Sequence, residues 1–439
     1  MTQHKAISGF SKLSSDEKVN WLKETVGLPG SFVHELRSHV HQDPEKQELY
    51  EEFSENTISN FFIPYGLAPN FLVNSKWYVV PMAIEESSVV AAASHAAKFW
   101  SAHGGFTAVV EDPIKVGQVH FIWTGNNSFI ADLFEKSKDA LVSAMVPFTE
   151  SMKKRGGGIK EIRLVDKTRD MDHYYQLHAD FRTAEAMGAN FINTVLEALA
   201  SEWKKVVQEE AASHNVPGTL EINMAILSNY TPESLVKVSV ETDVSALGVF
   251  DAELSGKAFA EKFVRAVEIA KADPYRAVTH NKGIFNGMDG VVIATGNDFR
   301  AVEACGHAYA ARNGQYRSLS SASLEDDLFR FTLEVPMSVG TVGGLTSGHP
   351  LARTSLKIMQ EPTAEELMMI IGAAGLANNF SAVRSLITSG IQKGHMKMHL
   401  VNILRQVGAT EAQKKAAQEY FRDRTVSYAD VKNFISAHK

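Results

Sequence analysis

Between residues 106 and 227 the sequence alternates between strand-like and helix-like patterns, and few folds accommodate that alternation. Two long stretches place apolar residues three and four positions apart, which is the periodicity of an amphipathic helix. Short runs rich in β-branched and aromatic residues surround them, as is typical of strands. The expected helices are residues 131–152 and 189–212, and the expected strands are residues 106–110, 119–124, 160–165, 174–181 and 220–227. Strands with two interposed helices predict a compact α/β sandwich inserted in the chain.

The rest of the chain is predicted to be mainly helical. Its 439 residues are too many for one ordinary core, and about 100–200 residues per domain predicts two or three domains. A β-rich run at residues 77–84 leads through a polar corner into an alanine-rich helix at 89–100, and residues 235–244 predict another strand. Further helices are expected at residues 258–272, 299–313 and 364–390, and short amphipathic helices follow from residue 393 onward.

Composition and charge exclude several classes of protein. Apolar residues make up 44% of the chain and charged residues 22%, which are values of an ordinary soluble globular protein. The formal charge of -7 argues against a general nucleic-acid binder. The single cysteine, Cys305, excludes an intramolecular disulfide framework and fits a reducing compartment. The N-terminus lacks the apolar core of a signal peptide, and the longest apolar stretch is shorter than the roughly 20 residues of a membrane span. We therefore expect a cytoplasmic protein with no membrane segment.

The motifs of the common nucleotide-binding folds are absent. The sequence contains neither the glycine-rich dinucleotide fingerprint nor a phosphate-binding loop. His395 and His399 lie one helical turn apart, a spacing that could bind a metal ion. No third ligand is evident, so we expect no metal. One of the two histidines is then functional or capping, and the other is structural.

A pair of carboxylates marks the corner between the strand at 77–84 and the helix that follows it. Glu85 and Glu86 precede two serines and an apolar run. A carboxylate at a helix N-terminus is usually a solvated capping group. Two carboxylates in tandem raise the alternative that one of them is shielded from solvent. Its pKa would then be raised, which suits proton donation.

Three further places combine polar groups with features that suit a ligand. Residues 273–287 are predicted to form a polar loop, in which Arg276 could grip a carboxylate and Lys282 could stabilise an oxyanion, although a merely solvated loop remains the alternative. Asp298 precedes a helix that it would cap, and capping can coexist with catalysis. Gly188 opens the second helix of the inserted domain, where free N–H groups make an anion site.

Five segments together resemble the hydroxymethylglutaryl-coenzyme A (HMG-CoA) reductases, in particular the bacterial soluble class II branch. They fall in the family's order across nearly the whole chain, which makes the resemblance specific. The matching segments are residues 85–93, 185–190, 273–287, 294–304 and 390–396.

The resemblance implies an α+β fold with three parts. A large, mainly helical catalytic domain would comprise residues 1–112 and 229–389. An inserted ferredoxin-like domain, residues 113–228, would bind the nicotinamide cofactor without a Rossmann fold, and residues 390–439 would form a mobile helical flap. The family also implies a homodimer, or a higher multiple of dimers, whose subunits share each active site.

The implied activity is the reduction of HMG-CoA to mevalonate and coenzyme A with two NAD(P)H, or the reverse reaction, which the same residues serve. The partners would be HMG-CoA, mevalonate and coenzyme A. Catalytic roles fall on Glu86, Lys282, Asp298 and the flap residue His395. Substrate contacts fall on Ser88, Arg276, Asn286 and Asn378. Cofactor contacts fall on Thr149, Glu185, Met187, Gly188 and Asn190.

Departures from the family pattern concern mainly the choice of cofactor. The cofactor motif usually begins with aspartate and here begins with Glu185, after an apparent two-residue insertion. Thr149 stands where members that prefer NADH carry an aspartate, and the basic residues 153–155 follow it. Glu150 could supply the missing carboxylate, and the basic residues could be only a solvated helix end. We predict that NADPH is accepted at least as well as NADH.

A second function is a coenzyme A thioester-binding or acyl-transfer protein without redox activity. Acyl transfer through a thiol would require Cys305, the one cysteine of the chain. Its place inside the expected helix 299–313 favours a small buried hydrophobe instead.

Overall fold

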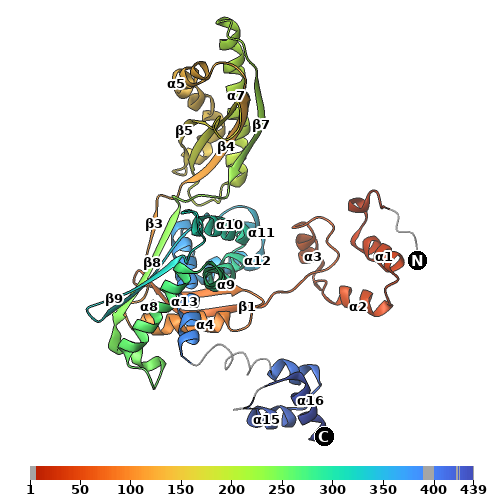
Figure 1. Cartoon of the computed structure of the whole chain (residues 1–439). Helices are drawn as coiled ribbons and strands as arrows, with labels where there is room; N and C mark the ends of the chain where they lie inside the picture. The colour runs from red at the N-terminus through yellow and green to blue at the C-terminus, as the bar shows by residue number, and fades with distance from the viewer. Residues whose placement is uncertain (1–5, 389–399, 422–423, 425, 439) are drawn as a thin grey trace. The chain divides into compact units, whose positions relative to one another are not determined.

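The protein is described from a computed structural model that covers residues 6–388, 400–421, 424 and 426–438. The chain divides into two compact units (Figure 1). One comprises Met1–Tyr65 with Ala83–Glu85, and the other comprises Gly66–Met82 with Glu86–Lys439.

The first unit consists of short helices, as the sequence predicts. They are α1 (Ser15–Val26), α2 (Gly30–Ser38) and α3 (Pro44–Glu51), after a 3-10 turn at Phe10–Lys12. Ser14 and Glu17 bond reciprocally to each other's backbone N–H groups and so form a capping box at the start of α1.

The second unit begins with a hairpin that leads into the candidate site. Asn74 and Ser75, both with positive φ, connect β1 (Tyr65–Val73) to β2 (Lys76–Ala83), as a tight hairpin turn requires. The chain then turns into α4 (Val89–Ser101), so the predicted strand, polar corner and helix are confirmed.

A four-stranded antiparallel sheet and a buried helix form the core of the second unit. The sheet has the order β3-β8-β10-β9, from β3 (Thr107–Glu111), β8 (Leu235–Asp243), β9 (Ser320–Glu325) and β10 (Leu328–Pro336). The helix α13 (Ala364–Ile387) packs against this sheet and against α4, α8 (Gly256–Ala272) and α9 (Pro274–Ala294). The expected strand 106–110 therefore belongs to the core sheet as β3, and its assignment to the inserted α/β sandwich was wrong.

Residues 115–228 form a ferredoxin-like sandwich. Its antiparallel sheet has the order β5-β6-β4-β7, in which the second strand along the chain lies at one edge and the fourth at the other. With helices in both crossovers, two in the first and one in the second, this is the split βαβ arrangement that the resemblance implies. The elements are β4 (Lys115–Trp123), α5 (Asn127–Ala144), α6 (Val146–Lys153), β5 (Gly158–Asp166), β6 (Tyr174–Arg182), α7 (Ala189–Ser213) and β7 (Leu220–Ser228). Buried aromatic side chains, Phe121, Trp123, Phe134 and Trp203 among them, fill the space between sheet and helices.

Two predicted elements differ from the structure. Residues 131–152 are two helices, α5 and α6, because Pro147 near the start of α6 lacks the N–H that a continuous helix needs. Of residues 273–287, predicted as a loop, Asp273 is the N-cap and the rest belong to the 21-residue helix α9 (Pro274–Ala294). Its glycines serve close packing: a Cβ on Gly287 would lie 2.3 Å from the Ala374 carbonyl oxygen of α13.

The helix α13 is long and apolar enough to cross a membrane by length and composition. Of the 18-residue stretch that meets this test, 83% is buried inside the protein, which is the pattern of a core helix. Farther along the chain, α15 (Glu411–Tyr420) and α16 (Tyr428–Ala437) share a separate small core with residues from Leu400 onward.

Candidate active site

The corner before α4 and the middle of α9 bring three of the predicted site residues together. Lys282 forms a hydrogen-bonded ion pair with the Glu86 carboxylate. The Asn286 amide donates to the same Glu86 oxygen over 3.2 Å. Lys282 and Asn286 are one helical turn apart, so helical geometry alone places both on one side of α9. The structure thus brings a carboxylate to a cation and an amide that lie 196 and 200 residues farther along the chain.

Neither of the tandem carboxylates is shielded from solvent, contrary to the alternative raised from the sequence that one of them is. Glu85 is exposed, and the Glu86 side chain retains 37% of its accessible surface. The Lys282 side chain retains 59%. The pair is therefore open to solvent and accessible to a substrate.

Arg276 lies in the first turn of α9, on the same helix as Lys282. The Asp273 carboxylate caps this helix by accepting from the Arg276 backbone N–H over 2.9 Å. The guanidinium group is half-buried, and burial lowers its pKa. Within the described part of the chain, no carboxylate pairs with it. A half-buried cation of this kind suits a carboxylate of a ligand.

Ser88 and Asn378 belong to two other elements, the start of α4 and the middle of α13. Ser88 is the N-cap of α4 with a φ of 77°, and its side chain makes no capping hydrogen bond. A left-handed conformation is uncommon for a residue other than glycine. Asn378 of α13 is 6% exposed, and its Nδ2 is buried with no partner among the described residues. Gly287 of α9 faces it, since a Cβ there would lie 2.8 Å from that nitrogen. A free buried amide donor is costly unless something else accepts from it.

Asp298 caps α10 (Phe299–Ala310), as predicted. Its Oδ1 accepts from the backbone N–H groups of Arg300 and Ala301. The Arg300 guanidinium also pairs with the carboxylate through two contacts, of 3.1 and 3.2 Å. Among the contacts of the described residues, Asp298 does not reach Glu86 or Lys282, so the predicted coupling of these three groups stays a prediction.

The histidines at 395 and 399 lie outside the described residues, and so does the segment 390–396. The role of His395 as a catalytic acid therefore stays a prediction. Within the described ranges, no group of three histidine, cysteine, aspartate or glutamate side chains could hold a metal ion.

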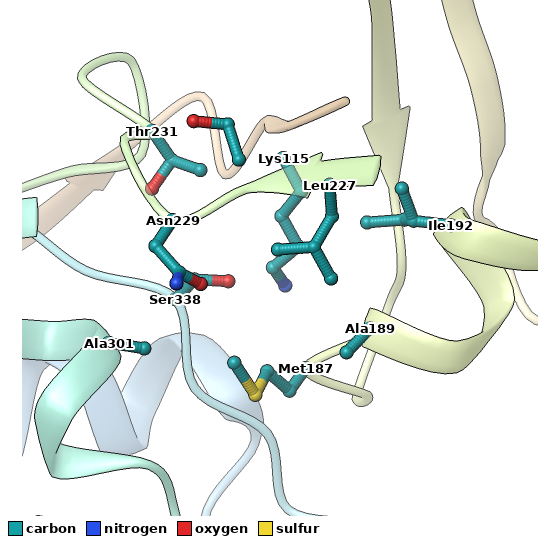
Figure 2. A pocket seen from close by; sticks show the side chains of 10 residues that line it. Lys115, Met187, Ala189, Ile192, Leu227, Asn229, Thr231, Ala301 and Ser338 are labelled. Atoms are coloured by element: carbon teal, nitrogen blue, oxygen red, sulfur yellow. The ribbon is translucent and has the colours of Figure 1, made fainter. Parts of the chain in front are cut away.

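The predicted cofactor motif lies at the start of α7, beside a small cavity. Gly188 is the N-cap of α7 in a left-handed conformation, and no side chain caps the helix. A cavity of about 20 Å³ is lined by Lys115, Met187, Ala189, Asn229 and Ser338, with Ile192, Leu227, Ser228, Thr231 and Ala301. Figure 2 shows Lys115, Asn229 and Met187 extending toward this space. Asn190, in the first turn of α7, is exposed.

Two of the predicted cofactor residues are already engaged within the protein. The Glu185 carboxylate accepts from the Thr341 hydroxyl over 3.0 Å and from the Ala364 backbone N–H over 2.6 Å. Thr149 is 1% exposed, and its hydroxyl donates to the Met145 carbonyl in the preceding turn. A ribose contact by the Thr149 side chain stays a prediction that this geometry does not support.

One charged residue of this region, Lys115, was not predicted from the sequence. Its side chain is 5% exposed, and its ammonium group donates to the Thr183 hydroxyl over 2.7 Å and to the Ala186 carbonyl over 3.2 Å. Burial lowers the pKa of Lys115 to about 8. The available signal was a lysine between the apolar residues Ile114 and Val116, but the predicted strand began only at residue 119.

Cys305 does not have the environment of a catalytic nucleophile. It is buried in α10, where its sulfur accepts from the Thr231 backbone N–H over 3.4 Å. Burial raises the pKa of the thiol. A buried, protonated thiol is inert, which argues against acyl transfer through Cys305.

Comparisons with known proteins show which family the chain is similar to. Residues 14–400 match the family model described as hydroxymethylglutaryl-coenzyme A reductase. A 3-hydroxy-3-methylglutaryl-coenzyme A reductase of Archaeoglobus fulgidus is 36% identical over 407 residues, which are 92% of this chain and 88% of that protein. A probable enzyme of the same name from Borreliella burgdorferi is 32% identical over 91% of this chain and 88% of its own.

Solved structures give the same result. The class II HMG-CoA reductase of Streptococcus pneumoniae, bound to NADPH in open conformations, superposes with a TM-score of 0.71 at 36% identity. That match covers 88% of this chain and all of the other. A second structure of the enzyme from this organism covers 99% of the chain with a TM-score of 0.72.

Proposed function

The chain belongs to the HMG-CoA reductase family, and from that premise we propose that it reduces HMG-CoA to mevalonate and coenzyme A with two NAD(P)H. The observation that carries the proposal is the exposed Glu86–Lys282 ion pair with Asn286 beside it. It places a cation, a potential proton donor and an orienting amide around one point.

Lys282 is the group that stabilises negative charge on the reacting carbonyl. Reduction of the thioester generates an oxyanion, and a positioned ammonium group beside it lowers the barrier because no solvent has to reorganise. Asn286 holds the Glu86 carboxylate against Lys282, so that the cation is placed before the substrate arrives.

Glu86 and His395 divide the proton transfers. The second reduction converts an aldehyde to an alcohol, and Glu86, in contact with Lys282, is assigned to deliver the proton that the new alkoxide takes up. The departing thiolate needs a proton as well, and His395 is assigned this role because the ordinary histidine pKa, about 6.5, suits it. Asp298 is assigned to tune Glu86 and Lys282 through its charge.

Arg276, Ser88 and Asn378 are proposed to bind the substrate. The half-buried Arg276 guanidinium suits the free carboxylate of the hydroxymethylglutaryl group. Asn378 offers its unpartnered Nδ2 to a substrate oxygen, which would satisfy a donor that the protein leaves free.

The residues beside the cavity of Figure 2 fit a nicotinamide dinucleotide. Gly188 leaves no room for a side chain, because a Cβ there would lie 2.3 Å from the Thr183 Cγ2 atom. The uncapped start of α7 that follows it suits a diphosphate, and Met187 and Asn190 flank this glycine in the chain. Two NAD(P)H molecules bound there in succession would each supply one hydride, one for each reduction. Glu185 and Thr149 are carried over from the family motif with less support, since both are engaged within the protein.

The remaining assignments follow from family membership. We propose a cytoplasmic homodimer or multiple of dimers, with the catalytic domain at residues 1–112 and 229–389, the cofactor domain at 113–228 and the flap at 390–439. The binding of mevalonate and coenzyme A as product or substrate is proposed on the same ground.

The test measures initial rates with NADH and NADPH in both directions. We expect consumption of reduced cofactor that depends on HMG-CoA, and formation of reduced cofactor from mevalonate, coenzyme A and the oxidised form. A matched Cys305→Ala variant should keep this activity. Absence of any cofactor turnover, together with another thioester activity lost in Cys305→Ala, would contradict the proposal and support acyl transfer.

A further inference from the structure

We propose that Lys115 and Glu185 are positioning residues. Their hydrogen bonds hold the turn 183–187 in one conformation against the large domain, so that the N-terminus of α7 is placed to bind the dinucleotide. Neither side chain needs to touch the cofactor in this role. The inference rests on the proposed function, because it concerns how the reductase binds NAD(P)H.

Lys115 connects the turn to the sheet of the inserted domain. It is the first residue of β4, beside the end of β6, and its ammonium group donates to both the Thr183 hydroxyl and the Ala186 carbonyl. The Thr183 hydroxyl donates to the same carbonyl over 2.6 Å. Two donors therefore converge on one carbonyl oxygen, and the peptide that connects Ala186 to Met187 is held in one orientation. Ala184, with a φ of 47°, shows that the turn adopts a conformation that needs such support.

Glu185, which is part of the same turn, connects it to the large domain. Its carboxylate accepts from the Ala364 N–H, at the first residue of α13, and from the Thr341 hydroxyl. Its carbonyl accepts from the Thr341 N–H over 2.8 Å, and Ala186 forms a β-bridge with Val342. A carboxylate at the start of a 24-residue helix also gains from the positive end of the helix dipole.

The turn 183–187 continues directly into the residues that face the cavity of Figure 2. Met187 and Ala189 line that cavity together with Lys115. The chain 338–341 lies tightly against the turn, since a Cβ on Gly340 would be 2.4 Å from the Met187 nitrogen. Asn297, next to Asp298, holds Gly340 by accepting from its N–H and donating to its carbonyl. The turn therefore connects the cofactor region to the residue before the proposed catalytic aspartate.

Charge supports this assignment. Burial is the larger influence on Lys115 and lowers its pKa to about 8, while the Glu185 carboxylate acts in the opposite direction. Arg182 and Glu365 are the other charged residues that line the second cavity shared by Lys115 and Glu185. Above about pH 8 the ammonium group loses its proton, and with it part of its hold on the Ala186 carbonyl.

The experiment measures KM for NADPH, KM for HMG-CoA and kcat, with direct NADPH binding by fluorescence titration. In Glu185→Gln and Lys115→Met we expect KM for NADPH to rise about tenfold, the loss expected for one charge-assisted hydrogen bond. We expect KM for HMG-CoA and kcat at saturating NADPH to change by less than about twofold. Matched controls are Glu365→Gln, at the same helix start, and Lys160→Met, on a strand of the same sheet; both should leave all three constants unchanged.

Two further variants separate positioning from general stability. In the wild-type enzyme the KM for NADPH should rise above about pH 8, and Lys115→Arg should remove that rise because a guanidinium group stays charged. Glu185→Asp should restore most of the affinity that Glu185→Gln loses.

The outcomes distinguish this inference from the proposed function. If the wild-type enzyme turns over NADPH with HMG-CoA but Glu185→Gln and Lys115→Met bind NADPH normally, the positioning role is wrong and the reductase assignment stands. A fall in thermal stability alone, with unchanged NADPH affinity, would also overturn it. If the wild-type enzyme turns over no cofactor, the proposed function fails first.

Discussion

At the scale of single residues, several site residues serve the fold and the chemistry at once. Asp298 caps α10 and is the proposed catalytic aspartate. Lys282, in contrast, makes its described polar contact with Glu86 alone, from an exposed position on α9. The two residues therefore allow catalysis and stability to be separated by substitution.

Lys282→Ala should lower kcat by roughly 10³-fold or more, because it removes the charge that stabilises the oxyanion. The exposed ion pair contributes little to folding, so the melting temperature should change by only a few degrees. Steady-state rates and thermal unfolding measured on one preparation check both parts. Near-normal turnover in the folded variant would rule out the role of Lys282.

Asp298→Asn and Asp298→Ala should differ in stability but not in activity. Asparagine caps a helix about as well as aspartate, whereas alanine costs about 0.5–2 kcal/mol. Both variants lose the carboxylate charge, so both should lose most of their turnover. Thermal or denaturant unfolding beside initial rates makes the comparison; retention of activity in Asp298→Asn would show that only the cap matters.

At the scale of elements, the site depends on how closely α9 and α13 approach each other. The helix α9 carries Arg276, Lys282 and Asn286, and α13 carries Asn378. Their contact requires a glycine at 287, because any side chain there would meet the α13 backbone. The spacing of these two helices therefore sets the positions of the proposed catalytic and substrate-binding groups.

Gly287→Ala should destabilise the protein by about 1–3 kcal/mol and reduce activity, since the added methyl group must push the two helices apart. Gly283→Ala, one turn earlier, is the control. A Cβ at 283 would make only an ordinary contact, 3.9 Å from the Ala382 Cβ, so this variant should be at least as stable as the wild type. Denaturant unfolding of both variants is the measurement, and equal effects would contradict the packing argument.

The end of α6 is the element proposed to discriminate between NADH and NADPH. Lys154 pairs with Glu150 over 3.0 Å, so the carboxylate next to Thr149 in the chain is partly neutralised. Lys153 and Arg155 then favour the 2′-phosphate of NADPH. We expect a kcat/KM for NADPH at least equal to that for NADH. A preference for NADH of more than about tenfold, or roughly 1.4 kcal/mol, would refute this while leaving the reductase assignment intact.

At the scale of the whole molecule, buried polar groups connect elements that are far apart in the chain. His280 of α9 is 1% exposed, and its Nε2 bonds to the Ser320 hydroxyl of β9, which donates to Asn379 of α13. The Asn379 side-chain amide donates a hydrogen bond to the His280 carbonyl. Since the Ser320 proton goes to Asn379, the proton of the neutral His280 ring lies on Nε2.

This neutral histidine predicts acid sensitivity. Burial, and to a smaller extent the charge of Arg276, lower the pKa of His280 to about 3, below the ordinary value of 6.5. Between these values the unfolded chain binds the proton and the folded chain does not, so this stabilising contribution is lost as the pH falls from 6.5 toward 3. We expect a slope approaching about 1.4 kcal/mol per pH unit from this group.

The measurement is the free energy of unfolding from pH 7 to pH 4, for the wild type and for His280→Gln. The glutamine variant should be less stable at neutral pH, because it replaces a well-packed ring. Its stability should nevertheless fall less steeply with acid. Parallel pH profiles of the two proteins would mean that His280 does not titrate on unfolding.

Local patterns predicted most of the secondary structure, because a strand or an amphipathic helix is specified by residues within a few positions of one another. The split βαβ domain, the corner before α4 and the helix start at Gly188 are such cases. Pro147 is the kind of local signal that was available but outweighed by a continuous apolar pattern. The helix at 274–294 was missed because its glycines suggest a loop until a partner helix is present.

Sequence by itself therefore determined the family, the α+β fold and the identity of the proposed catalytic side chains. Tertiary structure alone decided that Lys282 and Asn286 contact Glu86 and that Asn378 has a donor without a partner among the described residues. It also decided that the exposed Glu185 and the buried Thr149 are already hydrogen-bonded to other parts of the protein. The tertiary structure also buries Lys115 and places its ammonium group against the Ala186 carbonyl of the cofactor motif. The physical reason is that burial and hydrogen-bond partners depend on residues tens to hundreds of positions away, which no local pattern contains.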